Sequence, residues 1–176
     1  MENQSIIQRL NRLREVMKKK SIDYYMIPTA DFHNSEYVSD FFKVREYYSG
    51  FNGSNGTLLV WQEGAGLWTD GRYFVQAKKQ LEGTGITLYK MHQQGVPTIE
   101  ELLAEQMQQG QRLGFDGRVL SAEAGLELEK ALVKKEVSLY YEEDVAGELW
   151  ENRPKLPAGQ VFVLEADICG RSYEEK

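Results

Sequence analysis

The side chains that could carry out catalysis by themselves are few and scattered. There are two histidines, His33 and His92, far apart in sequence, and one cysteine, Cys169. No H-E-x-x-H, C-x-x-C or G-x-S-x-G motif, the usual marks of a zinc site, a redox pair or a nucleophilic serine, occurs. Asp31 and His33 could form an orienting pair, but hydrogen bonding within a polar loop explains them equally well. We therefore expect no catalytic residue and no metal ligand in this chain.

Arg72 is the charged residue whose position is most informative. The pattern predicts a helix from Asp70 to Leu81 with Asp70 as its N-cap, so that Arg72 lies in the first helical turn. The positive end of the helix dipole disfavours a cation there, so Arg72 needs a specific partner. Its planar fork suits a carboxylate. That partner is either Asp70 or another nearby acid of the chain, or else a bound ligand.

Three glycines, Gly50, Gly53 and Gly56, recur every third residue before a predicted strand. Such spacing suits backbone at positive φ or the close approach of other groups. A phosphate-binding loop would carry G-x-x-x-x-G-K-[ST] and open a helix, and this segment does neither. We therefore interpret it as a turn. A small-ligand binding module with an open cleft around residues 50–56 remains an alternative function.

The elements that must position these residues alternate between strands and helices, after one early hairpin with its turn at 63–66. Apolar and β-branched runs predict strands over 24–27, 57–61, 67–69, 86–91, 112–115, 137–141 and 161–164. Helical periodicity predicts helices over 5–20, 36–42, 70–81, 98–109, 121–134 and 148–152. Thr98 and Glu101 form a capping box, and Ser121 is an N-cap. This order predicts an α/β fold in which a mixed β-sheet is sandwiched by helices.

Length and composition restrict the class of protein. The 176 residues, 41% hydrophobic and 27% charged, suit one globular domain with a tail. The net charge of -6 disfavours a general nucleic-acid binder, which needs a cationic face. No apolar run approaches the roughly 20 residues of a membrane span, and the N-terminus lacks a signal-peptide pattern. A single cysteine suits a reducing compartment. We expect a cytoplasmic protein without nucleic-acid or membrane partners.

The composition changes near Arg153. Pro154 and Pro157 are typical of a linker, and the final residues are polar. We therefore expect a first domain over 1–152, while 153–176 form a linker and the start of the next domain of a longer chain.

Three blocks of sequence carry a resemblance to a known family. They are IPTADFHNSEY at 27–37, SGFNGSNGT at 49–57 and LWTDGRYFVQA at 67–77, and LWENRP at 149–154 adds to them. Together they resemble the N-terminal domain of Xaa-Pro aminopeptidases (aminopeptidase P). Prolidase and creatinase relatives share this domain type, so a prolidase (Xaa-Pro dipeptidase) N-terminal domain is the nearest alternative.

The resemblance implies a fold, an activity and a role for one residue. The fold would be the creatinase-type, RNase H-like N-terminal domain. The whole enzyme would release the N-terminal residue that precedes proline, using two divalent metals, usually manganese, held in a C-terminal domain outside this chain. The N-terminal domain would be non-catalytic, would support assembly, with a homodimer as one candidate, and would wall the substrate cleft. By resemblance, Arg72 is the residue that contacts the peptide substrate.

Overall fold

A six-stranded mixed sheet forms the centre of the computed structural model, which describes residues 2–176. The strands are β1 (Tyr24–Pro28), β2 (Thr57–Trp61), β3 (Gly64–Thr69), β4 (Ile86–Lys90), β5 (Arg112–Gly114) and β6 (Ser138–Tyr140). Their order in the sheet is β4-β3-β2-β1-β5-β6. The pairs β1–β2 and β2–β3 are antiparallel, whereas β3–β4, β1–β5 and β5–β6 are parallel. The predicted mixed sheet is confirmed.

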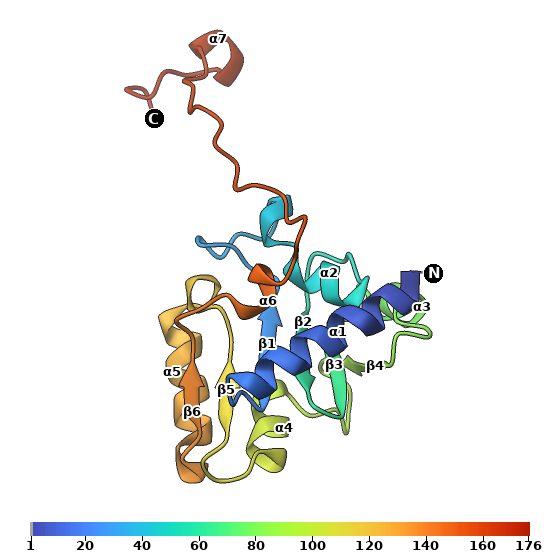
Figure 1. Cartoon of the computed structure of the whole chain (residues 1–176). Helices are drawn as coiled ribbons and strands as arrows, with labels where there is room; N and C mark the ends of the chain where they lie inside the picture. The colour runs from blue at the N-terminus through green and yellow to red at the C-terminus, as the bar shows by residue number, and fades with distance from the viewer. Residues whose placement is uncertain (1) are drawn as a thin grey trace.

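Helices cover both faces of this sheet (Figure 1). The helices that do so are α1 (Glu2–Lys19), α2 (Val44–Ser49), α3 (Phe74–Gln80), α4 (Ile99–Gln106), α5 (Ala122–Leu132) and α6 (Val145–Glu148), whereas α7 (Ala166–Cys169) lies away from the sheet (Figure 1). Short 3-10 turns lie at Asp40–Phe42, Gly117–Val119 and Val133–Lys135. Buried residues of α1, α2, α3 and α6 belong to one core cluster, and those of α4 and α5 belong to the other. The arrangement is therefore a three-layer α/β sandwich, as predicted.

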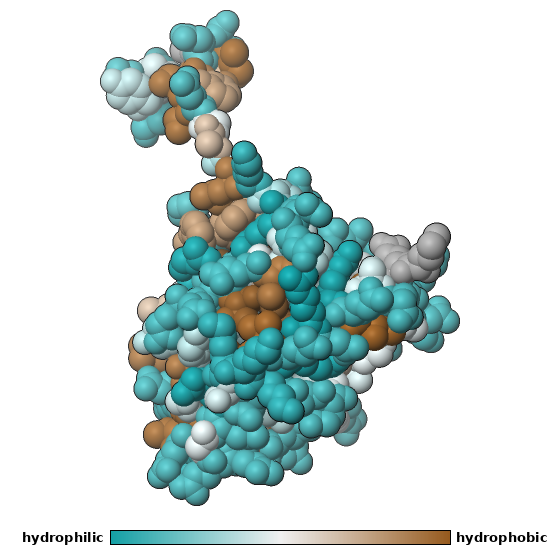
Figure 2. Space-filling view, viewed as in Figure 1, coloured by the Kyte–Doolittle hydropathy of each residue, from teal (hydrophilic) through white to brown (hydrophobic). Residues whose placement is uncertain are grey.

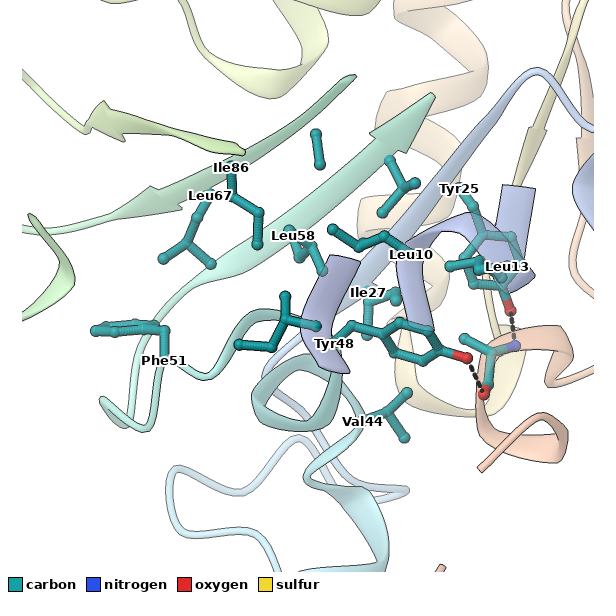
Figure 3. Packing of buried hydrophobic residues seen from close by; sticks show 14 of the residues in the cluster. Leu10, Leu13, Tyr25, Ile27, Val44, Tyr48, Phe51, Leu58, Leu67 and Ile86 are labelled. Carbon is teal, nitrogen blue, oxygen red and sulfur yellow. Dashed lines mark hydrogen bonds between the residues drawn. The ribbon is translucent and has the colours of Figure 1, made fainter. Parts of the chain in front are cut away.

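Alternation along the strands builds the two cores. Tyr25 and Ile27 of β1 face the α1 side, while Tyr24 and Met26 face the α4 side. On the α1 side, the hydroxyls of Tyr25 and Tyr48 converge on the backbone of Ala146 in α6 (Figure 3). Because α6 follows the last strand, these contacts hold the end of the domain against its central strand.

The capping signals read from the sequence are confirmed. Thr98 accepts a hydrogen bond from the backbone N–H of Glu101, whose carboxylate accepts from the backbone N–H of Thr98. Ser121 accepts from the backbone N–H of Ala124 at the start of α5. Such caps succeed as predictions because donor and acceptor lie within one turn of each other.

Five sequence expectations were wrong. The helix expected from Asp70 begins only at Phe74, because residues 70–73 form a turn in which Tyr73 N–H donates to the Asp70 carbonyl oxygen. The segment 43–48, which was given no element, lies in and beside α2, and of the helix expected over 36–42 only a 3-10 turn forms. The helix expected over 148–152 lies earlier, because Asp144 caps α6. The hairpin turn falls at residues 62–63, so that β3 starts at Gly64.

The strand expected over 161–164 is a sixth error. This segment is extended, but it pairs with no strand of residues 2–176. It belongs to a C-terminal stretch that leaves the body and carries α7 close to the end of the chain (Figure 1). The surface of the body in view is mostly hydrophilic, whereas the C-terminal stretch carries a concentration of apolar residues (Figure 2). Val161, Phe162 and Val163 are each more than three-quarters exposed. Within residues 2–176, no helix is long and apolar enough to cross a membrane.

Candidate functional site

Arg72 lies shortly after β3, at the end of the sheet where the strands β1 and β3 terminate and the antiparallel strand β2 begins. The glycine loop, residues 50–56, passes over this edge. Thr29 donates from its backbone N–H and from its hydroxyl to the Gly56 carbonyl oxygen, at 3.0 and 2.8 Å. The hydroxyl of Thr69 donates to the Asn55 carbonyl oxygen at 2.6 Å. The ends of β1 and β3 therefore fix the loop that borders Arg72.

The guanidinium of Arg72 is held along one side by Asp70. Its Nε donates to Asp70 Oδ1 at 3.0 Å, and its Nη2 donates to Oδ2 at 2.8 Å. The backbone N–H of Arg72 also donates to Oδ1, at 3.0 Å. Asn55 adds a fourth hydrogen bond, from Nδ2 to Asp70 Oδ2 at 2.6 Å. Asp70 is therefore the partner that the sequence required, and it acts as a turn acceptor instead of a helix cap.

The two side chains of this ion pair differ in exposure. Arg72 is 61% exposed, while Asp70 is only 19% exposed. The hydrogen bond from the Arg72 side chain, together with that from Asn55, holds the pKa of Asp70 well below its usual range. The same pairing raises the pKa of Arg72. Both groups are ionised at neutral pH. The guanidinium of Arg72 is therefore exposed and positively charged, while the Arg72–Asp70 pair as a whole carries no net charge.

Tyr73 and Arg45 support the glycine loop from beneath. The Tyr73 hydroxyl lies 2.8 Å from the Ser54 hydroxyl, and its ring meets Phe51 edge-on. Arg45 Nη2 donates to the Gly53 carbonyl oxygen at 2.6 Å. A Cβ atom at Gly56 would lie 2.9 Å from Arg45 Nη1 and 2.9 Å from the Trp68 carbonyl oxygen, and since that backbone oxygen is fixed in β3 the close approach requires glycine. The interior of the loop is filled by protein side chains, which supports its interpretation as a turn.

The sequence analysis did not predict two features of the structure. The first is the burial of Arg45, which is only 5% exposed although arginine is usually a surface residue. The second is a repeated Asp-Gly-Arg turn at residues 116–118, in which Arg118 donates to Asp116 from its backbone N–H, Nε and Nη2, as Arg72 does to Asp70. The repeat was visible in the sequence, whereas nothing local marked Arg45 as buried.

The loop after β1 contains the other residues considered for chemistry. Asp31 Oδ1 accepts from the backbone N–H groups of His33 and Ser35, both at 2.9 Å. The hydrogen bond from Ser35, followed by that from His33, lowers the pKa of Asp31. The Asp31 carboxylate therefore stabilises its own loop, in agreement with the interpretation that Asp31 serves hydrogen bonding within that loop. Nowhere in residues 2–176 do three His, Cys, Asp or Glu side chains gather closely enough to hold a metal ion.

Two hollows open on either side of the glycine loop. One, of about 800 Å³, lies beside Gly50 and Asn52 and is bordered by charged residues of both signs. The other, of about 280 Å³, adjoins Asn55 and Gly56 and is lined by Trp68 and the 91–100 segment. Asn55 thus borders a hollow and also holds the Asp70 carboxylate.

The sheet order, the two helical layers and the arginine at the sheet edge define an α/β domain without a metal centre of its own among its described residues. Residues 9–143 match the creatinase/prolidase N-terminal domain model. The chain belongs to the creatinase/prolidase N-terminal domain family, and the resemblance read from its sequence is confirmed.

Relatives with similar sequences are described as aminopeptidases. The chain is 38% identical, over its full length, to a probable Xaa-Pro aminopeptidase P of Talaromyces marneffei, and covers 27% of that protein. It is 37% identical to aminopeptidase P2 of Arabidopsis thaliana, of which it covers 24%. This chain therefore spans about a quarter of the length of these curated relatives.

Solved structures agree with this family. The X-prolyl aminopeptidase of Caenorhabditis elegans, described as a cytosolic enzyme with a di-nuclear active site, superposes with a TM-score of 0.84 at 30% identity, over 98% of this chain and 29% of that one. The N-terminal domain of the peptidase PepQ of Mycobacterium tuberculosis matches with a TM-score of 0.57 at 27% identity, over 81% and 98% of the two chains. A Xaa-Pro dipeptidase of Bacillus anthracis, at 22% identity, shares the fold.

Proposed function

We propose that this chain is the non-catalytic N-terminal domain of a metal-dependent Xaa-Pro aminopeptidase. The whole protein releases the N-terminal residue of peptides that have proline in second position. The observation that carries this proposal is the full-length match to Xaa-Pro aminopeptidases that are about four times longer. A prolidase is the less favoured alternative, because the curated relatives that match nearly the whole chain at 37–38% identity are described as aminopeptidases.

In this proposal Arg72 contacts the peptide substrate. Its guanidinium is exposed, fixed along one side by Asp70 and placed on the rim of the sheet. A guanidinium in that setting donates hydrogen bonds to a peptide oxygen in a wet cleft. The domain thereby walls the substrate cleft while the reaction takes place elsewhere in the protein.

The metals belong outside this chain in the same proposal. No cluster of ligands exists among residues 2–176, so none of these residues is assigned to a metal. Two divalent ions, with manganese as the proposed identity, supply the activation of water in the catalytic domain. A cytoplasmic location is supported by the cytosolic C. elegans neighbour. We also propose assembly through this domain, with a homodimer as the simplest form.

The proposed domain limits are 1–152 for this domain and 153–176 for the linker and the start of the next one. Arg153, the first residue of the proposed linker, still binds the body through Asp144 and the Phe41 carbonyl oxygen. Beyond it, residues 155–164 are exposed and form neither helix nor strand, which supports a limit close to this point.

Two activity measurements test the function. Residues 1–176 alone, with added Mn²⁺, should not cleave an Xaa-Pro peptide, while the full-length protein should. Turnover by the short chain above a buffer control, in a preparation free of host peptidases, would show that the domain is catalytic. A full-length protein that cleaves Xaa-Pro dipeptides, and does not cleave peptides of three or more residues, would favour the prolidase alternative.

The contact of Arg72 with substrate is tested by Arg72→Met in the full-length protein. The proposal expects kcat/KM for a peptide to fall by about tenfold or more, the effect of one lost charge-assisted hydrogen bond, at a nearly unchanged Tm. Arg118→Met is the matched control, since Arg118 makes the same side-on pair with Asp116. Normal kinetics for Arg72→Met with a large fall in Tm would mean that Arg72 serves only the local ion pair.

A further inference from the structure

The hydrogen bonds of Arg72 leave one edge of its guanidinium open. An arginine offers five N–H donors in a fixed fork. Nε and one N–H of Nη2 point to Asp70, which leaves the second N–H of Nη2 and both of Nη1. Within residues 2–176 no hydrogen bond from Nη1 is found, and the side chain is 61% exposed. The free edge therefore presents two parallel donors to the solvent.

Arg118 shows that an Asp-Gly-Arg turn does not by itself leave such an edge. Its side-on bonds to Asp116 match those at Arg72, and it is similarly exposed, at 55%. Each guanidinium carbon also lies 5.3 Å from an aromatic ring centre, that of Phe32 for Arg118 and that of Tyr73 for Arg72. The difference is that Nη2 of Arg118 also lies 3.3 Å from the buried Asp144 carboxylate, whereas within residues 2–176 Asp70 is the only carboxylate in salt-bridge distance of Arg72.

The charge of the Arg72 site follows from its neighbours. Asp70 takes four hydrogen bonds, from the Arg72 side chain and backbone and from Asn55. Asn55 is neutral, so the cluster of these three residues carries one positive and one negative charge. A peptide carboxylate gains little from a site without net charge, because the attraction to the cation is offset by repulsion from Asp70. A peptide carbonyl needs only aligned donors.

We propose that Asp70 is a positioning residue that determines substrate specificity: it neutralises and orients Arg72 so that the free guanidinium edge binds a backbone carbonyl oxygen instead of a terminal carboxylate. The inference rests on the proposed contact between Arg72 and the peptide. Its consequence is that the site does not select for a free C-terminus close to the scissile bond. The enzyme therefore accepts peptides longer than a dipeptide through this contact.

The test compares matched substrates in the full-length protein. Ala-Pro-Ala and Ala-Pro-Ala-Ala are each used with a free C-terminus and as the C-terminal amide, which removes the terminal charge. The measured quantity is the ratio of kcat/KM for acid over amide. In Asp70→Asn, Arg72 becomes an uncompensated cation, and the ratio should rise by about fivefold for the peptide whose C-terminus reaches Arg72, as expected for one charge pair in a wet cleft.

Two variants show whether the effect acts through Arg72. Adding Arg72→Met to Asp70→Asn should return the ratio to the wild-type value. Asp116→Asn, which breaks the equivalent pair at Arg118, should leave the ratio unchanged. An unchanged ratio in Asp70→Asn, with kcat/KM lowered by Arg72→Met, overturns the proposal and leaves the contact with substrate standing. If Arg72→Met alters the kinetics of no peptide, the contact itself fails, and the proposal fails with it.

A measurement on the wild-type protein keeps the test valid even if Asp70→Asn does not fold. Salt screens a free cation, so a charged site would lose its preference for acid peptides between about 0.05 and 0.5 M salt. We expect the part of the acid-over-amide ratio that depends on Arg72, obtained by comparison with Arg72→Met, to be independent of salt. A salt-dependent contribution from Arg72 would overturn the proposal.

Discussion

Nη2 of the buried Arg45 donates a 2.6 Å hydrogen bond to the carbonyl oxygen of Gly53, and so joins α2 to the glycine loop that borders Arg72. Among the described residues Arg45 has no carboxylate within salt-bridge distance, and its Nε and Nη1 find no hydrogen-bond partner. The Phe51 ring lies 4.7 Å from its guanidinium carbon. Burial lowers the pKa of Arg45 to about 10, so it remains charged at neutral pH. The glycine loop is thus supported by a buried cation whose removal from water costs free energy.

Truncation of Arg45 should destabilise the domain. In Arg45→Ala the loss of volume and of the hydrogen bond to Gly53 should lower the free energy of unfolding by about 2–4 kcal/mol. Arg45→Met keeps most of the volume and removes the buried charge, so its cost should be about 1.5 kcal/mol or less. Urea unfolding of residues 1–176 measures both. Equal losses for the two variants would show that the charge itself, and not the filled volume, supports the loop.

Asp144 joins the end of the domain to its body. Its Oδ1 accepts from the Gly147 backbone N–H at 2.8 Å, and its Oδ2 accepts from Arg153 Nη1 at 2.5 Å. Asp144→Ala removes the N-cap of α6 and leaves Arg153, 13% exposed, without its carboxylate. The expected loss of unfolding free energy is about 3–5 kcal/mol, measured by urea denaturation.

The exposed pair between Arg12 and Glu151 provides the control for Asp144. Its side chains are 51% and 69% exposed. Glu151→Ala should leave the urea midpoint nearly unchanged, because exposed ion pairs contribute little to stability. If Glu151→Ala and Asp144→Ala were equally destabilising, burial would not be the reason for the effect at Asp144.

Stability should fall at alkaline pH because of the buried tyrosines. Burial raises the pKa of Tyr25 and Tyr48 above the ordinary value of 10.0. A raised folded-state pKa means that the folded state binds the proton more tightly, so this contribution is fully present below pH 10 and is lost as pH rises above it. In Tyr48→Phe the decrease in the urea midpoint between about pH 9 and 11 should be shallower than in wild type. Identical slopes would show that Tyr48 does not contribute.

The pKa of Asp70 can be measured directly. The Asp70 carboxyl should stay ionised at pH values well below the usual pKa range of an aspartate, because the Arg72 side chain and Asn55 donate hydrogen bonds to the charged form. The carboxyl ¹³C shift of Asp70, followed by NMR during acid titration, reports this value. Arg72→Met should move the titration back toward the ordinary range, and Asn55→Ala should move it part of the way. A titration that Arg72→Met does not change would mean that the ion pair does not persist in solution.

Local rules account for the elements that the sequence predicted well. The capping box at Thr98 and Glu101 and the N-cap at Ser121 depend on atoms within one helical turn. The failures are also instructive. Asp70 has the residue type of an N-cap, but its carboxylate is bound by the Arg72 side chain and by Asn55, fifteen positions earlier. The helix around Arg45, α2, has only six residues, so the spacing of its two buried apolar residues, Val44 and Tyr48, was too short to reveal a helical period.

The sequence by itself determined the α/β order, the caps and the family, because these depend on residue types at short or fixed spacings. It also identified Arg72 as a residue in need of a specific partner, which could be an acid of the chain or a bound ligand. Only the tertiary structure decided that Asp70 binds one edge of the guanidinium and leaves the other open, and that Arg118, in the same Asp-Gly-Arg setting, is engaged by Asp144. The pair inside each Asp-Gly-Arg is local, because its partners are two positions apart. Whether a further carboxylate reaches the guanidinium depends on segments far apart in the chain, such as Asp144, 26 positions from Arg118, and spacing alone does not specify that contact.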